Sequence, residues 1–423
     1  AAAAMTNLEE SFTSDYQEYF EQGEENTPIK GVVEAGDVLR KVESETGIKP
    51  ALVYIAFSPS APQPASGNPD VTPESPQDPL ELILVTSDGK AIRKTIPGAT
   101  RATVMALATQ FRDGVTNPVR RNNAGPLIEP AQKLYQWLIT PLQPELQNRG
   151  IQNLTFILDV GLRSMPMAAL YDDQNQKYLV EQYSLGLMPT LSLTDTRYVN
   201  LRDTRLLAMG TSQFSQTKDL GSLPAVPLEL GIIAREWQSK SLLDDNFTLA
   251  NLRQQPPFGI VHLATHATFR PGGPTDSFIQ FGDSRLTLKQ LRDLYTQDRA
   301  PELLVLSACR TAFGNKQAEL GFAGTALQAQ VKTVLASLWS VSDIGASGLM
   351  SEFYYQLKAA PIKAEALRQA QIAMLRKAVY IKDGKLRWSG GVQPLPSALT
   401  GLESIDLSHP YYWSAFTLVG SPW

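Results

Sequence analysis

Few residues of this chain could perform nucleophilic chemistry, because its 423 residues include one cysteine and three histidines. Cys309 follows the apolar run 303–306, and His266 follows the apolar run 260–264. A thiolate can attack a carbonyl carbon, while an imidazole can accept the thiol proton and later protonate a leaving amine. The two residues, both at the ends of apolar runs, therefore predict a cysteine–histidine dyad.

Each of these residues also has a structural interpretation. A free cysteine is most often a small buried hydrophobic residue, and His262, inside an apolar run, is most simply a hydrogen-bonded core residue. A single thiol excludes an intrachain disulfide, and with only three histidines a cysteine-rich zinc site is excluded as well. We therefore expect no metal and no cofactor, and we weigh the dyad against an inert, buried Cys309.

The elements that must position the pair alternate between strand and helix. Strand-like runs cover 205–210, 259–264, 302–308 and 333–339, and helix-like runs cover 228–239, 286–295, 321–331 and 344–357. This alternation predicts an α/β fold with a mostly parallel sheet flanked by helices. Ligands bind at the carboxyl ends of the strands in such sheets, so His266 and Cys309 should lie side by side on one rim. A β-rich stretch at 413–420 predicts an added edge strand.

The first 200 residues mix acidic, proline-rich and apolar segments. Residues 1–30 hold seven acidic residues and one lysine, and Tyr16, Tyr19 and Phe20 would share one face of a helix. This segment is either a weakly docked terminus or a docked segment that gates a site. Seven prolines between 59 and 79 predict an exposed loop that joins antiparallel strands at 52–57 and 80–86. We divide the chain into an acidic segment (1–30) and two α/β domains (31–200 and 201–423).

Composition argues against several classes of function. The formal net charge is −4, which disfavours a broad phosphate-binding surface and so nucleic acid as a partner. No apolar run reaches the roughly 18 residues of a transmembrane helix, so we expect no membrane partner. Phosphate-loop and dinucleotide-binding glycine motifs are absent, which disfavours a nucleotide-dependent α/β enzyme. The single thiol and the lack of a secretory signal favour the cytoplasm.

Longer motifs around the dyad resemble those of the CHAT family, caspase-like proteases named for their association with HetF and tetratricopeptide repeats. Only Ala308-Cys309-Arg310 fits the general caspase signature around a catalytic cysteine. The motifs that carry the resemblance are His262-Leu263-Ala264-Thr265-His266, Leu306-Ser307-Ala308-Cys309-Arg310-Thr311-Ala312, Leu338-Trp339, Phe353-Tyr354, Pro166-Met167-Ala168-Ala169-Leu170 and His409-Pro410-Tyr411-Tyr412-Trp413. The resemblance covers roughly residues 32–422.

The resemblance implies a two-part body like that of separase, with a pseudo-protease half at 31–200 and an active caspase-like half at 201–423. It makes Cys309 the nucleophile and His266 the general acid and base, with the backbone N–H groups of Cys309 and Ala267 as the oxyanion hole. The family often has glycine where this chain has Ala267. The resemblance also implies a bacterial source, signalling by limited proteolysis, and a protein activator or a partner containing tetratricopeptide repeats.

Substrate recognition is expected beside residues 338–343. Caspase-like folds hold a peptide as an added strand, and the predicted contacts here are Trp339, Ser340 and Ser307. Asp343 lies where separase-like chains carry an acid that faces the P1 side chain, which would favour arginine or lysine there. Alternatively, Asp343 is the N-cap of the helix that begins near Ile344.

Two functions stay open from the sequence. The first is a cysteine endopeptidase that cleaves a protein substrate in a regulated way, with Arg310 and Lys316 as candidate self-cleavage positions and Asp276 and Asp283 as weaker substrate contacts. The second is a catalytically silent, caspase-like scaffold. The presence of both dyad residues favours the peptidase, whereas an inert thiol at Cys309 would favour the scaffold.

Overall fold

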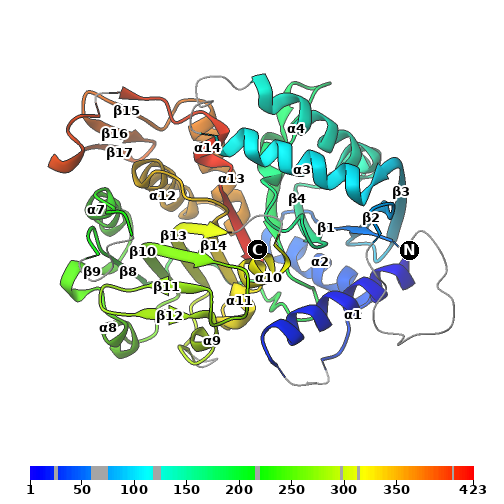
Figure 1. The fold of residues 1–423 in the computed structure, drawn as a ribbon, viewed down its shortest axis with the longest axis horizontal. Coiled ribbons are helices and arrows are strands. Elements are labelled where there is room, and N and C mark those ends of the chain that lie inside the picture. Colours follow the sequence, from blue (N-terminus) through cyan, green and yellow to red (C-terminus); the bar gives the residue numbers. More distant parts are fainter. Residues whose placement is uncertain are drawn as a thin grey trace.

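The computed structural model of the protein describes residues 1–22, 27–58, 75–117, 125–214, 220–295, 299–311, 315–402 and 404–423, without the side chains of 125–127 (Figure 1). In these ranges the chain folds around one large sheet with helices on both of its faces. Among the described helices, none combines the length and the apolar character needed to cross a bilayer.

The central sheet has thirteen described strands, in the order β12-β11-β10-β13-β14-β19-β7-β4-β1-β2-β3, with β8 paired to β10 and β9 to β8. The strands are β1 (Pro50–Phe57), β2 (Pro79–Thr86), β3 (Ala91–Thr100), β4 (Asn153–Leu158), β7 (Ser184–Leu187), β8 (Leu206–Gly210), β9 (Ser239–Leu243), β10 (Ile260–Phe269), β11 (Phe278–Gln280), β12 (Arg285–Thr287), β13 (Leu303–Thr311), β14 (Thr333–Ser337) and β19 (Phe416–Gly420). Strands β9, β8, β10, β13 and β14 run parallel to one another, as do β19, β7, β4 and β1. The predicted mostly parallel sheet is confirmed.

Helices cover both faces of this sheet. They are α1 (Ala2–Tyr19), α2 (Val32–Thr46), α3 (Arg101–Thr116), α4 (Gly125–Leu138), α5 (Gln143–Asn148), α6 (Leu179–Gln182), α7 (Val226–Glu236), α8 (Leu249–Gln254), α9 (Leu288–Leu291), α10 (Lys316–Ala323), α11 (Thr325–Gln328), α12 (Asp343–Leu357), α13 (Lys363–Leu375) and α14 (Pro410–Trp413). Figure 1 shows α3, α4, α7 and α12 on one face and α1, α2, α9 and α11 on the other. Every residue of β1, β4, β8 and β14 is buried, because a sheet covered on both faces needs near-continuous apolar strands.

The last strand joins the strands that come from either side of residue 200. β19 runs antiparallel to β14 and parallel to β7, with Val419 opposite Leu187. The predicted edge strand at 413–420 is therefore wrong, since Pro410–Trp413 is a helix and Phe416–Gly420 lies inside the sheet. Four of the five residues of β19 are buried, as an interior strand requires. The division of the chain into domains at residue 200 stays a prediction.

The acidic N-terminal segment is docked on the body. α1 buries Met5, Phe12 and Tyr16, and Phe20 is buried just beyond its end. Phe20 lies where a side chain at Gly324 would stand, because a Cβ there would come within 2.4 Å of its ring. Glycine at this position thus permits close approach of the N-terminal segment to the α10–α11 region. Docking is what the structure shows, and gating stays a prediction.

The remaining elements include the antiparallel pair expected at 52–57 and 80–86, which β1 and β2 form. Of the proline-rich segment that joins them, residues 59–74 lie outside the described ranges. A small second sheet has the order β17-β16-β15-β18, and β5 pairs with β6. These strands are β5 (Tyr171–Asp172), β6 (Lys177–Tyr178), β15 (Tyr380–Lys382), β16 (Lys385–Trp388), β17 (Gly391–Pro394) and β18 (Ser404–Ile405).

Candidate active site

His266 and Cys309 lie near the carboxyl ends of two neighbouring parallel strands, β10 and β13. The strands pair in register from Ile260 and Leu303 onward, and the register then shifts before His266. Beyond this irregularity, His266 pairs with Ala308 and Ala267 pairs with Cys309. The two candidate residues are therefore one register position apart on adjacent strands.

The side chains of the two residues project from opposite faces of the sheet. Residues paired directly across neighbouring strands share a face, and successive residues along a strand alternate between faces. Cys309 therefore shares its face with Ala267, and His266 shares the other face with Ala308. Burial follows the same division, since Cys309 and Ala267 are buried while His266 and Ala308 are partly exposed.

Cys309 faces the layer that contains α10 and is closed off from solvent, with an exposed fraction of 0%. On the same face of β10, Phe269 packs edge-on against Phe322 of α10. The thiol donates a hydrogen bond to the Leu306 carbonyl at 3.5 Å. Burial raises the pKa of the Cys309 thiol to about 12, so at neutral pH it is protonated and a poor nucleophile.

Ser337, the last residue of β14, holds the backbone of Cys309. The Cys309 N–H donates to Ser337 Oγ at 3.0 Å, and the same hydroxyl donates to the Cys309 carbonyl at 3.2 Å. The Cys309 N–H is one of the two predicted oxyanion donors, and this bond occupies it. Ala267, the other predicted donor, is 1% exposed. In this conformation the predicted oxyanion hole is closed.

His266 faces the loop between β8 and α7. Its Nε2 lies 2.8 Å from the carbonyl oxygen of Gly221, and its ring centroid lies 5.0 Å from that of Phe214. A carbonyl only accepts hydrogen bonds, so Nε2 carries the proton and Nδ1 of the neutral ring is left as an acceptor. Within the described ranges no hydrogen bond joins this imidazole to the Cys309 thiol. The tautomer suits a base that receives a thiol proton on its own face of the sheet.

Asp343 begins α12 but does not cap it. Ser342 is the N-cap, and its Oγ accepts from the Gly345 N–H at 3.3 Å, so the alternative that Asp343 is the N-cap is wrong. Instead, Asp343 Oδ2 accepts from the Ala225 N–H at 2.6 Å, at the start of α7. Burial raises the pKa of this carboxyl group. Asp343 thereby ties α12 to the end of the loop that contacts His266.

The other predicted substrate contacts are divided between surface and core. Trp339 is buried and donates from Nε1 to the Tyr411 carbonyl at 3.1 Å. Ser340 is exposed, and its carbonyl accepts from Tyr411 Oη at 3.0 Å. Ser307 is buried within β13. The structure thus brings Trp339 and Ser340 together beside α14, and it leaves Ser307 inside the sheet.

Comparison with known sequences assigns the family. A profile described as the CHAT domain matches residues 128–421, which is more than half of the chain. The chain belongs to the CHAT family. No curated protein sequence matches it significantly.

The fold of this CHAT chain is similar to that of separase. In the Saccharomyces cerevisiae separase–securin complex at 3.0 Å resolution, the matched chain is 10% identical, the match covers 92% of this chain and 30% of that chain, and the TM-score is 0.51. The CHAT chain therefore spans less than a third of the separase chain. At this identity the likeness shows the fold alone, which is caspase-like and related to that of proteases.

Gingipain structures match less well. The complex of Porphyromonas gingivalis RgpB pro- and mature domains is 11% identical over 77% of both chains, with a TM-score of 0.41. The Arg-specific cysteine proteinase gingipain R is 11% identical over 76% of this chain and 74% of that chain, with a TM-score of 0.39. Because both scores lie below 0.5, the fold assignment rests on separase.

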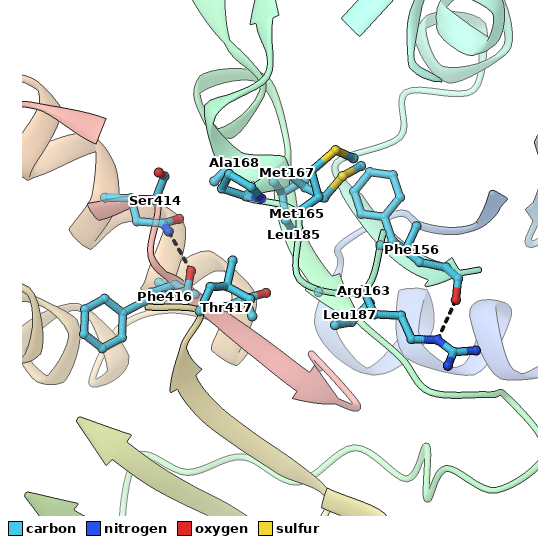
Figure 2. Close-up of a pocket in the computed structure, with 16 residues that line it drawn as sticks. Phe156, Arg163, Met165, Met167, Ala168, Leu185, Leu187, Ser414, Phe416 and Thr417 are labelled. Carbon is cyan, nitrogen blue, oxygen red and sulfur yellow. Dashed lines mark hydrogen bonds between the residues drawn. The ribbon is translucent and has the colours of Figure 1, made fainter. Parts of the chain in front are cut away.

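A small cavity lies where the strands of the CHAT chain meet at β7 and β19. Its volume is about 30 Å³, and Met165, Leu187 and Phe416 are among its apolar lining residues (Figure 2). Arg163 also lines it and donates from Nε to the Leu158 carbonyl at 2.9 Å. A cavity of this size holds about one or two waters, so it cannot take a peptide side chain.

A wider, acidic hollow of about 490 Å³ opens at the carboxyl ends of β8 and β9. Three aspartates, Asp244, Asp245 and Asp283, are among the residues that line it. Residues 211–213 also line it and lead directly to Phe214, whose ring lies tilted beside that of His266. Of the two weaker candidates from the sequence, Asp283 lies in this hollow. The other, Asp276, accepts from the Gly273 N–H at 2.9 Å in the loop after β10.

Sequence reasoning missed three buried polar residues beside the strand that carries Cys309. Arg112 of α3 is 6% exposed, and Ser164 and Glu319 are fully buried. Charged residues on helices usually face solvent, so the residue types of Arg112 and Glu319 did not indicate that they are buried. A signal was present in the spacing, because Arg112 lies four residues after Ala108 on the buried stripe of α3.

His262 belongs to a buried polar cluster, as expected of a core residue. Its Nε2 lies 2.8 Å from Glu229 Oε1, and its Nδ1 lies 3.1 Å from Tyr354 Oη. Ser347 Oγ donates to the second oxygen of Glu229 at 2.8 Å. The cluster joins β10 to α7 and α12. In the described part of the chain, no group of three or more acidic, histidine or cysteine side chains could hold a metal ion.

Proposed function

We propose that this chain is a cysteine endopeptidase with a His266–Cys309 dyad, and that the described conformation is latent. The observation that carries the proposal is the β10–β13 pairing, which puts the two residues one register position apart at the carboxyl ends of adjacent strands. Membership of the CHAT family and the separase-like fold support it. By the same likeness, residues 31–200 form a pseudo-protease half and residues 201–423 the catalytic half.

In the active arrangement the Cys309 thiol lies on the His266 face of the sheet. Nδ1 of His266 accepts the thiol proton, and the thiolate attacks the carbonyl carbon of the scissile peptide bond. The backbone N–H groups of Cys309 and Ala267 donate to the oxyanion that forms. The imidazolium protonates the leaving amine, and water then hydrolyses the thioester, which restores the thiol.

The described conformation differs from this arrangement in three ways. The Cys309 thiol is on the wrong face, its pKa is raised by burial, and its N–H is occupied by Ser337. A buried thiol with a high pKa is inert, so the change to the active arrangement requires rearrangement of 308–311. Regulation by a protein activator, or by a partner containing tetratricopeptide repeats, fits this requirement. A reducing compartment such as the cytoplasm fits a single free thiol, and the resemblance to the family implies signalling by limited proteolysis in a bacterium.

The substrate is a protein segment that adds as a strand beside Ser340, with arginine or lysine at P1. Two observations support the basic preference: the Asp343 carboxylate beside the His266 loop, and the acidic hollow that Asp244, Asp245 and Asp283 line. A charged donor at P1 pairs with such carboxylates, whereas a neutral side chain leaves them without a cationic partner. Arg310 is exposed on β13, and Lys316 is exposed at the start of α10 and paired with Asp15, so both remain candidates for self-cleavage.

The test compares peptides that carry a fluorogenic amide and differ only at P1. The wild-type chain should cleave after arginine or lysine, and Cys309→Ala and His266→Ala should each abolish cleavage. Cleavage after neutral residues would be consistent with the His266–Cys309 dyad but would refute the proposed preference for arginine or lysine at P1. Cleavage that survives Cys309→Ala would overturn the proposal. Ser337→Ala, which frees the backbone of Cys309, is assayed in parallel in case the latent wild-type chain is silent.

A second candidate function is a catalytically silent scaffold, and the burial of Cys309 is the observation that favours it. A scaffold would bind its protein partner without any change in the reactivity of the thiol. The measurement that separates the two is alkylation of Cys309 with and without that partner. A thiol that stays inert in the complex, together with no peptide cleavage by any variant, would favour the scaffold.

A further inference from the structure

We infer that Arg112 is a positioning residue that holds the end of the Cys309 strand in its latent orientation; this rests on the proposed function. Arg112 lies on α3, in the N-terminal half of the chain, and its side chain donates to three carbonyls on three separate segments. Nη1 donates to Ser164 at 2.8 Å, and Nη2 donates to Leu338 at 2.8 Å and to Thr311 at 3.3 Å. The planar guanidinium provides five N–H donors in a fixed geometry, which suits it to bridge several acceptors at once.

Two of these three carbonyls lie beside the nucleophile. Thr311 is the second residue after Cys309 in β13, and Leu338 follows Ser337, which holds the Cys309 backbone on both its N–H and its carbonyl. Arg112 therefore joins the ends of the two strands that fix Cys309. Its guanidinium also lies over the Trp339 ring, with Cζ 5.6 Å from the ring centroid.

The charge of Arg112 is balanced within the same buried region. Glu319 of α10 is 0% exposed, and it accepts from the Gly161 N–H at 2.6 Å and from Ser164 Oγ at 2.7 Å. Burial lowers the pKa of Arg112 to about 10, and the Glu319 charge opposes this effect. The guanidinium therefore stays charged at neutral pH. Ser164, whose carbonyl binds Arg112 and whose hydroxyl binds Glu319, connects the two.

Bringing Cys309 to the His266 face would break this arrangement. A side chain changes face when its strand slips by one residue, and the carbonyl groups along a strand alternate in direction. The slip that presents Cys309 to His266 therefore turns the Thr311 carbonyl away from Arg112. Because Arg112 and Ser164 both lie in the N-terminal half, a movement of that half reaches the Cys309 strand through the bonds of Arg112 to Thr311 and Leu338.

The experiment uses the rate at which a soluble alkylating reagent labels the full chain. Cys309 is the only cysteine, so every labelled thiol reports this position. Arg112→Met removes all side-chain donors and keeps an unbranched side chain that matches arginine as far as Nε, and we expect labelling about tenfold faster or more, the equivalent of about 1.4 kcal/mol. Arg112→Lys keeps the charge and part of the hydrogen bonding, so its rate should fall between those of Arg112→Met and the wild-type chain. This graded rescue is a result that loss of packing alone would not give.

Two matched controls separate positioning from general instability. Arg149→Met removes a guanidinium from the same half that pairs with Asp88 and Glu145 instead. Leu146→Ala removes buried apolar volume from α5, away from the three carbonyls. Labelling that depends weakly on added urea indicates local opening, whereas strong dependence indicates global unfolding. If Arg112→Met does not fold, Glu319→Gln keeps the shape of the cluster, removes its negative charge, and should also accelerate labelling.

The inference and the proposed function can fail separately. Faster labelling in Arg112→Met, without peptide cleavage by any variant, would support Arg112 as a positioning residue and would rule out the proposed peptidase function. Cleavage by the wild-type chain, with labelling of Arg112→Met no faster than that of Arg149→Met, would remove the inference alone. Equal acceleration in Arg112→Met and Leu146→Ala, with equal dependence on urea, would also overturn it.

Discussion

Replacing Glu9 by alanine should release α1 from the body, whereas replacing its neighbour Glu10 should not. Glu9 is 0% exposed, and Glu10 is exposed on the same helix. The Glu9 carboxylate accepts hydrogen bonds from Tyr54 Oη at 2.8 Å, from the N–H groups of Leu191 at 3.0 Å and Ser192 at 2.9 Å, and from Ser192 Oγ at 2.7 Å. The two variants therefore remove the same chemical group from one helix, and only one of them removes buried bonds.

The magnitude follows from these four bonds. A hydrogen bond to a charged group contributes about 1.5–3 kcal/mol, but bonds that share one acceptor group are not additive. Without the carboxylate, the N–H groups of Leu191 and Ser192 and two hydroxyls lose their acceptor. At about 1–3 kcal/mol for each unsatisfied group, and with less than full additivity, we expect a total cost of about 3–5 kcal/mol. Glu10→Ala should change the free energy of unfolding by no more than about 0.5 kcal/mol.

Hydrogen exchange read by mass spectrometry over residues 2–19 measures the release directly. A loss of about 3–5 kcal/mol corresponds to exchange about 10²–10³-fold faster or more in Glu9→Ala, while Glu10→Ala should match the wild-type chain. Equal protection of α1 in the two variants would refute the reasoning, because the four bonds would then not hold the helix. The same samples test gating: α1 contacts α10 through Asp15 and Lys316, so Cys309 should also be labelled faster in Glu9→Ala.

Three further predictions concern the site. The pKa of Cys309 is about 12 in the folded chain and about 8.5 in an unfolded one, so the unfolded state loses this proton first and stability should fall as pH rises from about 8.5 towards 12, by at most about 1.4 kcal/mol per pH unit. In urea unfolding at a series of pH values the wild-type chain should lose more stability than Cys309→Ala, since buried tyrosines such as Tyr16 titrate in both chains, and parallel curves would count against the burial of the thiol. Ser337→Ala removes both hydrogen bonds to the Cys309 backbone. Because two neutral hydrogen bonds are lost, alkylation of the thiol should be several-fold faster, and an unchanged rate would show that Ser337 does not hold Cys309. Asp343→Ala should lower the free energy of unfolding by about 1–2 kcal/mol through the lost bond to Ala225, and it should reduce kcat/KM for arginine at P1 more than for a neutral residue, whereas an equal reduction for both would limit Asp343 to its structural bond.

The strands that build the centre of the sheet could be predicted because they are buried on both faces. In the sequence, β8, β10, β13 and β14 are nearly continuous apolar runs. His266 and Cys309 lie near the carboxyl ends of β10 and β13. β3 was missed because only two of its ten residues are buried, so it carries no such run. β19 was predicted but misplaced, since an apolar strand does not specify its neighbours. Its place between β14 and β7 depends on packing with segments far away in the sequence.

The sequence alone singled out Cys309 and His266 as the candidates for nucleophilic chemistry, and it predicted that both lie on one rim of a mostly parallel sheet. Apolar runs and rare residue types are local properties, so they can be read directly. Only the tertiary structure decided that the two side chains face opposite sides, because this depends on a register shift between β10 and β13. A shift of one residue moves every following side chain to the other face of the sheet. The same holds for Arg112, whose three acceptors come together only when distant segments pack around its charge.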